Sequence, residues 1–183
     1  MGMSTRRILA LDDPELASYP LRQGLSVDSG KLASLRQSGA AEWLSKPERY
    51  LLVDDGEQFT LCAANEQTLE EATPLIAAAL GDSARFDPPR AHCALNTNDG
   101  VPLRPVMFVR IRAPHAHAPQ VREELVRRSA CVFEEDVQAD RIVVRAEAPL
   151  AELIGFSRSL RHATNDSAEL WSWLVRYETD AGN

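Results

Sequence analysis

The sequence has 183 residues, of which 44% are hydrophobic, and 27 acidic residues against 20 Lys and Arg give a formal net charge of −7. This apolar content is enough to bury a core without metal or disulfide support, in one domain or in two small ones. The negative charge disfavours long-range attraction to nucleic acid or to an anionic membrane, although a local patch could still bind either.

The cysteines and the apolar runs narrow the cellular setting. Cys62, Cys93 and Cys131 are odd in number and show no C-x-x-C spacing, so they indicate neither a disulfide framework nor a zinc site. No apolar run approaches the roughly 20 residues of a spanning helix, and the first residues turn acidic too soon for a signal peptide. We therefore expect a cytoplasmic protein with no membrane partner.

The N-terminal half alternates between strand and helix patterns. Asp54-Asp55-Gly56 suits a tight turn between two β-rich runs, and Pro74 predicts a kink or a shortening of the helix in which it lies. The elements predicted from periodicity are a strand at 8–11 or at 21–27, a helix at 31–44 interrupted at Gly39, strands at 49–53 and 58–63, a helix at 65–81, and a strand at 84–95 broken by Pro88-Pro89.

The C-terminal half repeats the same order after a polar stretch, Asn96–Pro105, that contains Gly and two Pro. Pro149 is expected in the first turn of its second helix, where an amide donor is not needed. Leu150, Leu153, Ile154 and Leu160 supply the buried stripe of that helix. The predicted elements are strands at 106–112, 131–137, 141–148 and 169–178, with helices at 118–130 and 148–163.

This order, βαββαβ, is that of the ferredoxin-like fold. We predict an α+β protein of two tandem ferredoxin-like domains with antiparallel sheets, each sheet covered by helices on one face. The predicted organisation is an N-terminal arm at 1–19, a first domain at 20–96, a linker at 97–104 and a second domain at 105–183.

Two stretches of the C-terminal half resemble the last, or fifth, domain of elongation factor G and related translational GTPases. These are APHAHAPQVREELVRRSACVFEE (113–135) and RAEAPLAELIGFSRSLRHAT (145–164), with Tyr177-Glu178 closing the last strand. VDDGEQFTLCAANEQTLEEA (53–72) and FDPPRAHCAL (86–95) resemble the factor's third domain more weakly. The resemblance covers about 75 residues at the C-terminus and roughly residues 31–95 before it.

Several family features are missing from the sequence. No G-x-x-x-x-G-K-[ST] phosphate loop occurs, so we expect no GTPase activity and no bound nucleotide or other cofactor. Only the short linker stands where the family has its fourth domain. The third-domain motif keeps only Glu66 and Leu69, and the loop at 164–168 lacks the family's two glycines and its arginine.

Strict alternation along the strands predicts an aromatic and arginine surface on the sheet face away from the helices. Met107, Val109 and Ile111 would point to the helices, with Arg112 and Val175 outward. The candidate protein-interface residues on the outer face are Phe108, Arg110, Val143, Arg145, Trp171 and Trp173. Such a surface could dock against the N-terminal half, bind another protein or a second copy, or stack single-stranded RNA.

The two C-terminal helices carry a second candidate surface. By resemblance it could contact ribosomal RNA or another phosphate, although Glu123, Glu124 and Glu152 dilute its charge. The candidate phosphate-contacting residues are Arg127, Arg128, Arg158 and Arg161, with Arg122 and His162 beside them.

Catalytic and metal sites are not predicted. His115 and His117 have no further ligand beside them, and the neighbouring His92 and Cys93 would point to opposite faces of a strand. We therefore expect a protein that is not an enzyme and holds no metal. The first hypothesis is a ribosome- or translation-associated binding factor; the alternative is a repurposed, self-associating or partner-binding interaction module without a ribosome role.

Overall fold

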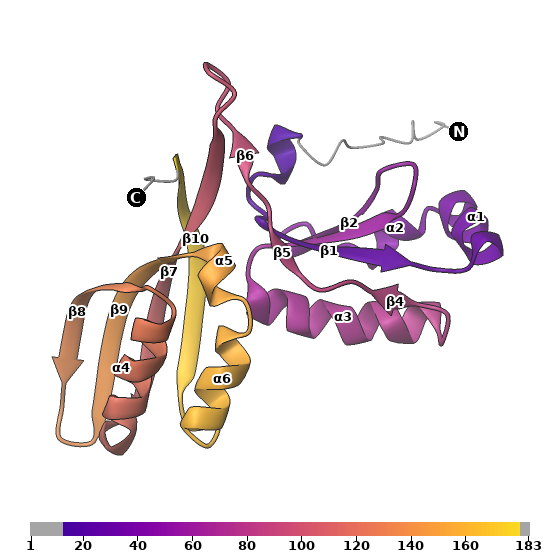
Figure 1. Ribbon diagram of the computed structural model, residues 1–183. Coiled ribbons are helices and arrows are strands. Elements are labelled where there is room, and N and C mark those ends of the chain that lie inside the picture. The colour runs from indigo at the N-terminus through magenta and orange to yellow at the C-terminus, as the bar shows by residue number, and fades with distance from the viewer. Residues whose placement is uncertain (1–12, 180–183) are drawn as a thin grey trace. The chain divides into compact units, whose positions relative to one another are not determined.

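The computed structural model describes residues 13–179, and the chain divides into two units, each drawn as a separate body of strands and helices in Figure 1. The N-terminal unit comprises residues up to Ala64 together with Thr68–Pro89. The C-terminal unit comprises Asn65–Gln67 and the residues from Arg90 onward. The boundary therefore falls at Pro89/Arg90, before the predicted linker at 97–104.

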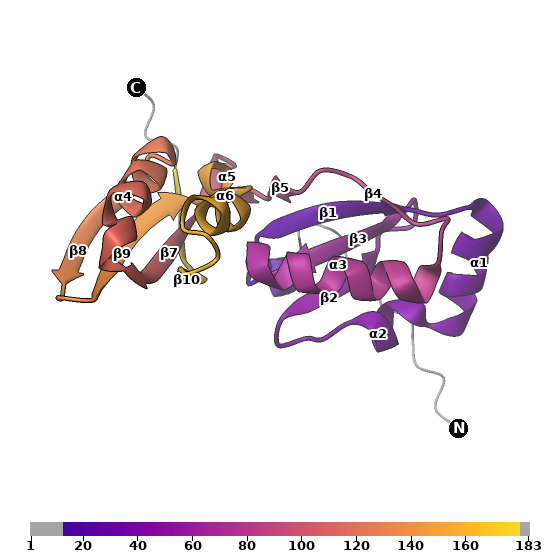
Figure 2. The same cartoon turned by 90° about the horizontal axis from the view of Figure 1, so that it is seen from below.

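The N-terminal unit contains an antiparallel sheet in the order β2-β3-β1-β4, and Figure 2 shows α3 lying across one face of it. This is the ferredoxin-like strand order. Of the two candidate first strands, 21–27 is confirmed, whereas 8–11 lies outside the described residues. The elements are η1 Pro14–Leu16, β1 Leu21–Ser26, α1 Ser29–Ser38, α2 Ala40–Leu44, β2 Tyr50–Asp54, β3 Phe59–Ala63, α3 Glu66–Leu80 and β4 Arg85–Phe86.

Local sequence explains most of these boundaries. Gly39 has a φ of 68° and separates α1 from α2, because a left-handed residue cannot continue a right-handed helix. The Asp55 carboxylate accepts bonds from the amides of Glu57 and Gln58, which holds the β2–β3 turn. The helix α3 is not shortened: it runs for 15 residues through Pro74 and ends at Gly81, whose φ is 73°.

The three cysteines differ sharply in accessibility. Cys62 in β3 is buried, and burial raises the pKa of its thiol while the neighbouring Arg22 guanidinium opposes that rise. Cys93 and Cys131 are exposed. We expect Ellman's reagent at pH 8 to modify two thiols of the native chain promptly and the third only in denaturant, because the thiolate is the reactive form. A Cys62→Ala variant that still shows a slow thiol would contradict this assignment.

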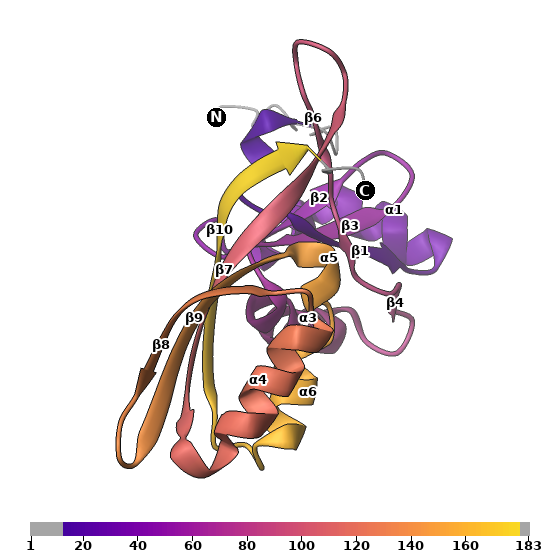
Figure 3. The same ribbon diagram turned by 60° about the vertical axis from the view of Figure 1, so that its left-hand side comes forward.

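The C-terminal unit has the sheet order β10-β7-β9-β8, with the short β6 paired to one end of β7. Figure 3 shows α4 and α6 side by side on one face of this sheet. The elements are β5 Arg90–Ala91, β6 Ala94–Leu95, β7 Pro102–Pro114, η2 His115–His117, α4 Ala118–Arg127, β8 Cys131–Val137, β9 Arg141–Pro149, α5 Leu150–Leu153, α6 Phe156–Ala163 and β10 Glu169–Thr179.

The core of this unit lies between the sheet and its helices. Met107, Val109 and Ile111 of β7 are buried, as the alternation predicts. They pair with Ala148, Ala146 and Val144 of β9. The helices contribute the buried side chains Val121, Leu125, Leu150, Leu153, Phe156 and Leu160. Both units thus have the predicted α+β, ferredoxin-like topology. Within residues 13–179, no helix is both long and apolar enough to cross a membrane.

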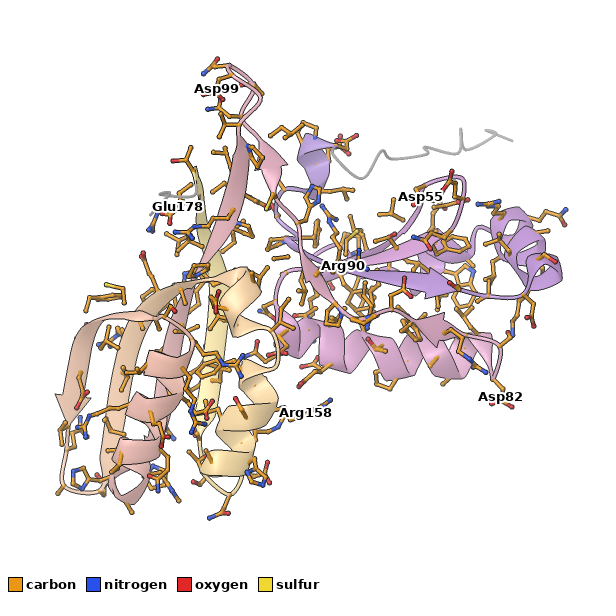
Figure 4. All side chains as sticks on the ribbon, viewed as in Figure 1. Asp55, Asp82, Arg90, Asp99, Arg158 and Glu178 are labelled. Carbon is orange, nitrogen blue, oxygen red and sulfur yellow. The ribbon has the colours of Figure 1, made fainter. Side chains whose placement is uncertain are left out.

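The stretch predicted as a linker is a β-hairpin loop instead. Ala94 and Leu95 of β6 pair with Leu103 and Pro102 of β7. The amide of Asn96 donates to the carbonyl oxygen of Val101 at 2.9 Å, and Gly100 turns the chain with a φ of 70°. Asp99 lies at the tip of this hairpin in Figure 4. Polar residues with Gly fit a turn as well as a linker, and the prediction took the wrong alternative.

The helix predicted at 148–163 is two helices. Ile154 is extended, with a ψ of 122°, and Gly155 has a φ of 83°, so α5 ends before α6 begins. Pro149 is the last residue of β9 and the N-cap of α5, with a ψ of 137°. Its expected place inside the first helical turn is therefore wrong by one position.

Candidate functional site

The outer face of the C-terminal sheet brings together the predicted interface residues. Trp171 pairs with Arg110, and Arg110 pairs with Arg145 on its other side. Trp173 pairs with Phe108 in the next row. Trp171 is 42% exposed and Trp173 is 49% exposed, so these large side chains present ring surface to solvent.

The aromatic side chains on this face form a cluster whose members come from three strands, β10, β7 and β8. The rings of Phe108 and Trp173 stack with centroids 4.2 Å apart and planes inclined by 21°. Phe133 of β8 approaches Phe108 at 5.6 Å and is itself 55% exposed. The Arg110 guanidinium carbon lies 5.4 Å from the centre of the Trp171 ring, within reach of a cation–π interaction.

Phe133 was missed by the sequence interpretation. Strict alternation would turn it toward the helices with Glu135, but the register shifts between Val132 and Glu134. Such a bulge re-aims the side chain beside it. No signal in the sequence of β8 marks this bulge, so only the structure adds Phe133 to the cluster.

Charged side chains surround the aromatic cluster and pair within the face. Arg112 binds Glu169 at 2.8 Å, and Arg176 binds Glu147 at 2.6 Å. Arg145 pairs with Glu134 on the adjacent strand. Val143 lies on this face opposite Arg112 and Asp136, but it is only 8% exposed. Its expected role as an exposed contact is therefore not supported by its burial.

The predicted arginine surface lies on the helix side of the sheet. Arg127 at the end of α4 binds Glu123 at 2.5 Å and Glu124 at 2.9 Å. Glu124 is buried and also accepts a bond from the Ser159 hydroxyl at 2.7 Å. Arg122 forms a bidentate pair with Glu135 and holds the pKa of that carboxyl below its usual range. These partners reduce the positive charge that α4 offers.

Arg128 supports the loop between α5 and α6. Its guanidinium donates to the carbonyl oxygens of Glu152 at 3.0 Å and Ile154 at 2.8 Å, and to the Ser159 hydroxyl at 3.1 Å. Its guanidinium carbon also lies 5.8 Å from the centre of the Phe156 ring. With these donors engaged within the unit, Arg128 is less available to a phosphate than Arg158 is.

The exposed side of α6 keeps the more available cations. Arg158 extends away from α6 in Figure 4 and has no ion pair with another described residue. Arg161 is partly exposed, donates to the Ser157 hydroxyl at 2.9 Å and lies 4.0 Å from the Asp166 carboxylate. His162 is exposed beside it. Of the four predicted contacts, Arg158 and Arg161 thus remain the best placed to meet an anion.

The histidines and cysteines are the residues from which a metal site or a nucleophile would be built. Among residues 13–179, no group of three or more His, Cys, Asp and Glu side chains could hold a metal ion. His115 and His117 belong to the short helix η2, which leads into α4.

The topology and the helix-covered sheet define the C-terminal unit as a ferredoxin-like α+β domain. Residues 103–182 match the family model described as elongation factor G C-terminus, which confirms the resemblance predicted from the two motif stretches. Over these residues, which make up less than half of the chain, the sequence is similar to that family.

Relatives of known sequence match the same region. Elongation factor 2 of Pyrococcus horikoshii is 33% identical over 81 residues, which is 44% of this chain and 11% of that protein. Elongation factor G of Gluconobacter oxydans is 31% identical over 76 residues, covering 42% of this chain and 11% of the relative. Elongation factor G 2 of Hahella chejuensis is 36% identical over 81 residues, which is 44% of this chain and 12% of the relative. The match spans about a tenth of the length of these relatives.

The structural likeness extends further along the chain than the sequence match. A solved structure from Thermus thermophilus superposes with a TM-score of 0.60 over 87% of this chain and 40% of that one, at 11% identity. At this identity the likeness shows the fold alone. It agrees with the two ferredoxin-like units found here.

Proposed function

We propose that this protein is a cytoplasmic, translation-associated binding factor that contacts ribosomal RNA and does not hydrolyse GTP. The proposal is supported by the match of residues 103–182 to the elongation factor G C-terminus. That match covers a domain without a phosphate loop, and the sequence contains none elsewhere. Binding through this domain therefore requires no nucleotide.

The exposed side of α6 is the proposed contact surface. Arg158 and Arg161 lie three residues apart on one helix, so their side chains share a face. Guanidinium groups bind phosphate oxygens through paired donors. Arg158 forms no ion pair with another described residue, so phosphate binding would not have to break one. The contact is local, because the chain as a whole carries a net charge of −7. We therefore expect binding that depends strongly on salt.

Co-sedimentation with purified ribosomes tests the proposal. We expect the chain to pellet with ribosomes at about 50 mM salt and to be released at about 200 mM, since phosphate contacts weaken as counterions compete. Arg158→Glu combined with Arg161→Glu should weaken binding by about tenfold or more and lower the salt slope by about one per lost contact. Binding should be the same with and without GTP.

The matched control is Arg85→Glu in β4, which changes one exposed charge on the other unit. It should leave co-sedimentation within about twofold of the parent chain, because the net-charge effect alone is small over screened distances. If the parent chain stays in the supernatant at about 50 mM salt, ribosome binding is ruled out. If both charge reversals on α6 pellet as well as the parent, α6 is not the contact surface.

A further inference from the structure

The outer face of the C-terminal sheet combines large exposed rings with charged groups and does not depend on the α6 surface. We propose that this face is a homodimer interface, on which a second copy of the chain packs sheet against sheet. Exposed aromatic clusters on a sheet usually mark an interface. Trp and Arg are also the residue types that dominate interface energies. The charged side chains on this face indicate that the partner is a second copy of the chain.

Two charged groups on the face lack an oppositely charged partner among residues 13–179. The Arg110 guanidinium contacts the Trp171 ring but pairs with no carboxylate of the described chain. The Asp136 carboxylate accepts a bond from the Gln138 amide at 3.0 Å but pairs with no described cation. Arg110 is on β7 and Asp136 on β8, with β9 between them. They also lie in different rows of the register, because Arg110 shares its row with Glu134 and Asp136 shares its row with Arg112.

A two-fold axis in the interface plane, running along β9, would give both Arg110 and Asp136 an oppositely charged partner. It would place β7 of one copy over β8 of the other, because these strands flank β9 at equal distances. Arg110 would then face Glu134 of the second copy, because both pair with Arg145 of β9, and Asp136 would face the second copy's Arg112, because both pair with Val143. The same operation would bring Phe108 over the second copy's Phe133, since the two lie at neighbouring register positions on this face.

The charge balance favours a second copy over single-stranded nucleic acid. Basic and acidic groups are both present on the face, and three ion pairs join them: Arg112 with Glu169, Arg145 with Glu134 and Arg176 with Glu147. A nucleic-acid platform needs a positive groove beside its aromatic rings. The Phe108 ring is also already stacked on Trp173 and flanked by Phe133. A surface that carries both signs fits another surface that carries both signs.

The size of the face sets the expected strength of the dimer. Four strands about 4.8 Å apart and about seven residues long project an area of roughly 400 Å². Stable interfaces bury about 800 Å² of accessible surface per partner, and weak ones bury less. We therefore expect a reversible dimer with a dissociation constant of about 1–100 μM, which corresponds to about −8 to −5.5 kcal/mol.

Sedimentation velocity on the full chain between about 1 and 300 μM tests the inference. The parent should shift from monomer to dimer across this range. Trp173→Ala and Arg110→Glu should each raise the dissociation constant by about tenfold or more. Arg110→Glu combined with Glu134→Arg should restore dimerisation, because Arg110 and Glu134 share a register row and so face each other across the axis.

Trp43→Ala is the matched control, because Trp43 is exposed on α2 of the other unit. It should dimerise like the parent, and circular dichroism should show unchanged folding in every variant. A chain that stays monomeric at about 300 μM overturns the inference. So does a dimer that Arg110→Glu does not weaken, or that the charge exchange does not restore. A monomer whose tryptophan fluorescence is quenched by a uridine decamer would show that the face binds RNA instead.

Discussion

Replacing Phe156 by alanine is expected to lower the free energy of unfolding of the C-terminal unit by about 3–5 kcal/mol. Phe156 opens α6 and is 1% exposed, so its removal leaves a cavity between the helix layer and the sheet. Small domains are stable by only about 5–15 kcal/mol, and this variant uses a large part of that margin. The urea midpoint should fall by about 2 M for an m-value near 1.5–2 kcal/mol/M.

Tryptophan fluorescence can report this unfolding selectively. Trp171 and Trp173 lie in β10 of the C-terminal unit, and Trp43→Phe removes the signal of the other unit. Phe156→Leu should cost about 1–1.5 kcal/mol and remains measurable if the alanine variant fails to fold. Val126→Ala, at a residue that is 77% exposed on α4, should change stability by less than about 0.5 kcal/mol. A Phe156→Ala midpoint equal to that of Val126→Ala would refute the core assignment.

The importance of Phe156 was not visible in the sequence. Leu150, Leu153 and Leu160 keep helical spacing across residues 148–163, so periodicity predicts one continuous helix. A single glycine inside such a pattern is compatible with a helix, and it gave no firm reason to stop at Gly155. The left-handed φ of 83° at Gly155 starts a new helix, which places Phe156 in the core instead of Ile154.

Alternation predicted the sheet better than the helices, because each strand of a sheet covered on one face must separate buried from exposed residues. Met107, Val109 and Ile111 are buried and Trp171 and Trp173 are exposed, as the period of two requires. The rule fails where the register changes. The shift beside Phe133 in β8 and the one at Leu174/Arg176 in β10 depend on pairing partners that no single strand reveals.

The sequence predicts where the arginine side chains lie, but not which of their guanidinium groups can bind an anion. The sequence places Arg127, Arg128, Arg158 and Arg161 on or beside the two helices, and the structure agrees. Which guanidinium groups are available depends on carboxylates and carbonyl groups brought close by folding. Arg127 is held by two glutamates and Arg128 by loop carbonyl groups, whereas Arg158 extends from α6. The candidate contact surface therefore narrows from two helices to one.

Arg128→Ala is expected to destabilise the C-terminal unit by about 2–3 kcal/mol, because charge-assisted hydrogen bonds contribute about 1.5–3 kcal/mol and their carbonyl partners would lose a donor. Arg128 lies just after α4 and joins it to the α5–α6 loop through the carbonyl oxygens of Glu152 and Ile154. Arg128→Lys should recover less than half of the loss, since an ammonium group cannot reproduce the forked geometry. Urea unfolding followed by tryptophan fluorescence measures both variants.

Arg158→Ala provides the comparison, because it removes the same charged group from the same helix layer without removing an ion pair between described residues. It should change stability by less than about 0.5 kcal/mol while weakening ribosome co-sedimentation. Arg128→Lys should lower stability but leave ribosome co-sedimentation unchanged, because lysine keeps the positive charge and cannot make the paired hydrogen bonds of the guanidinium group. An Arg128→Ala chain as stable as Arg158→Ala would mean that Arg128 does not hold the loop, and Arg128 would then again be a candidate phosphate contact.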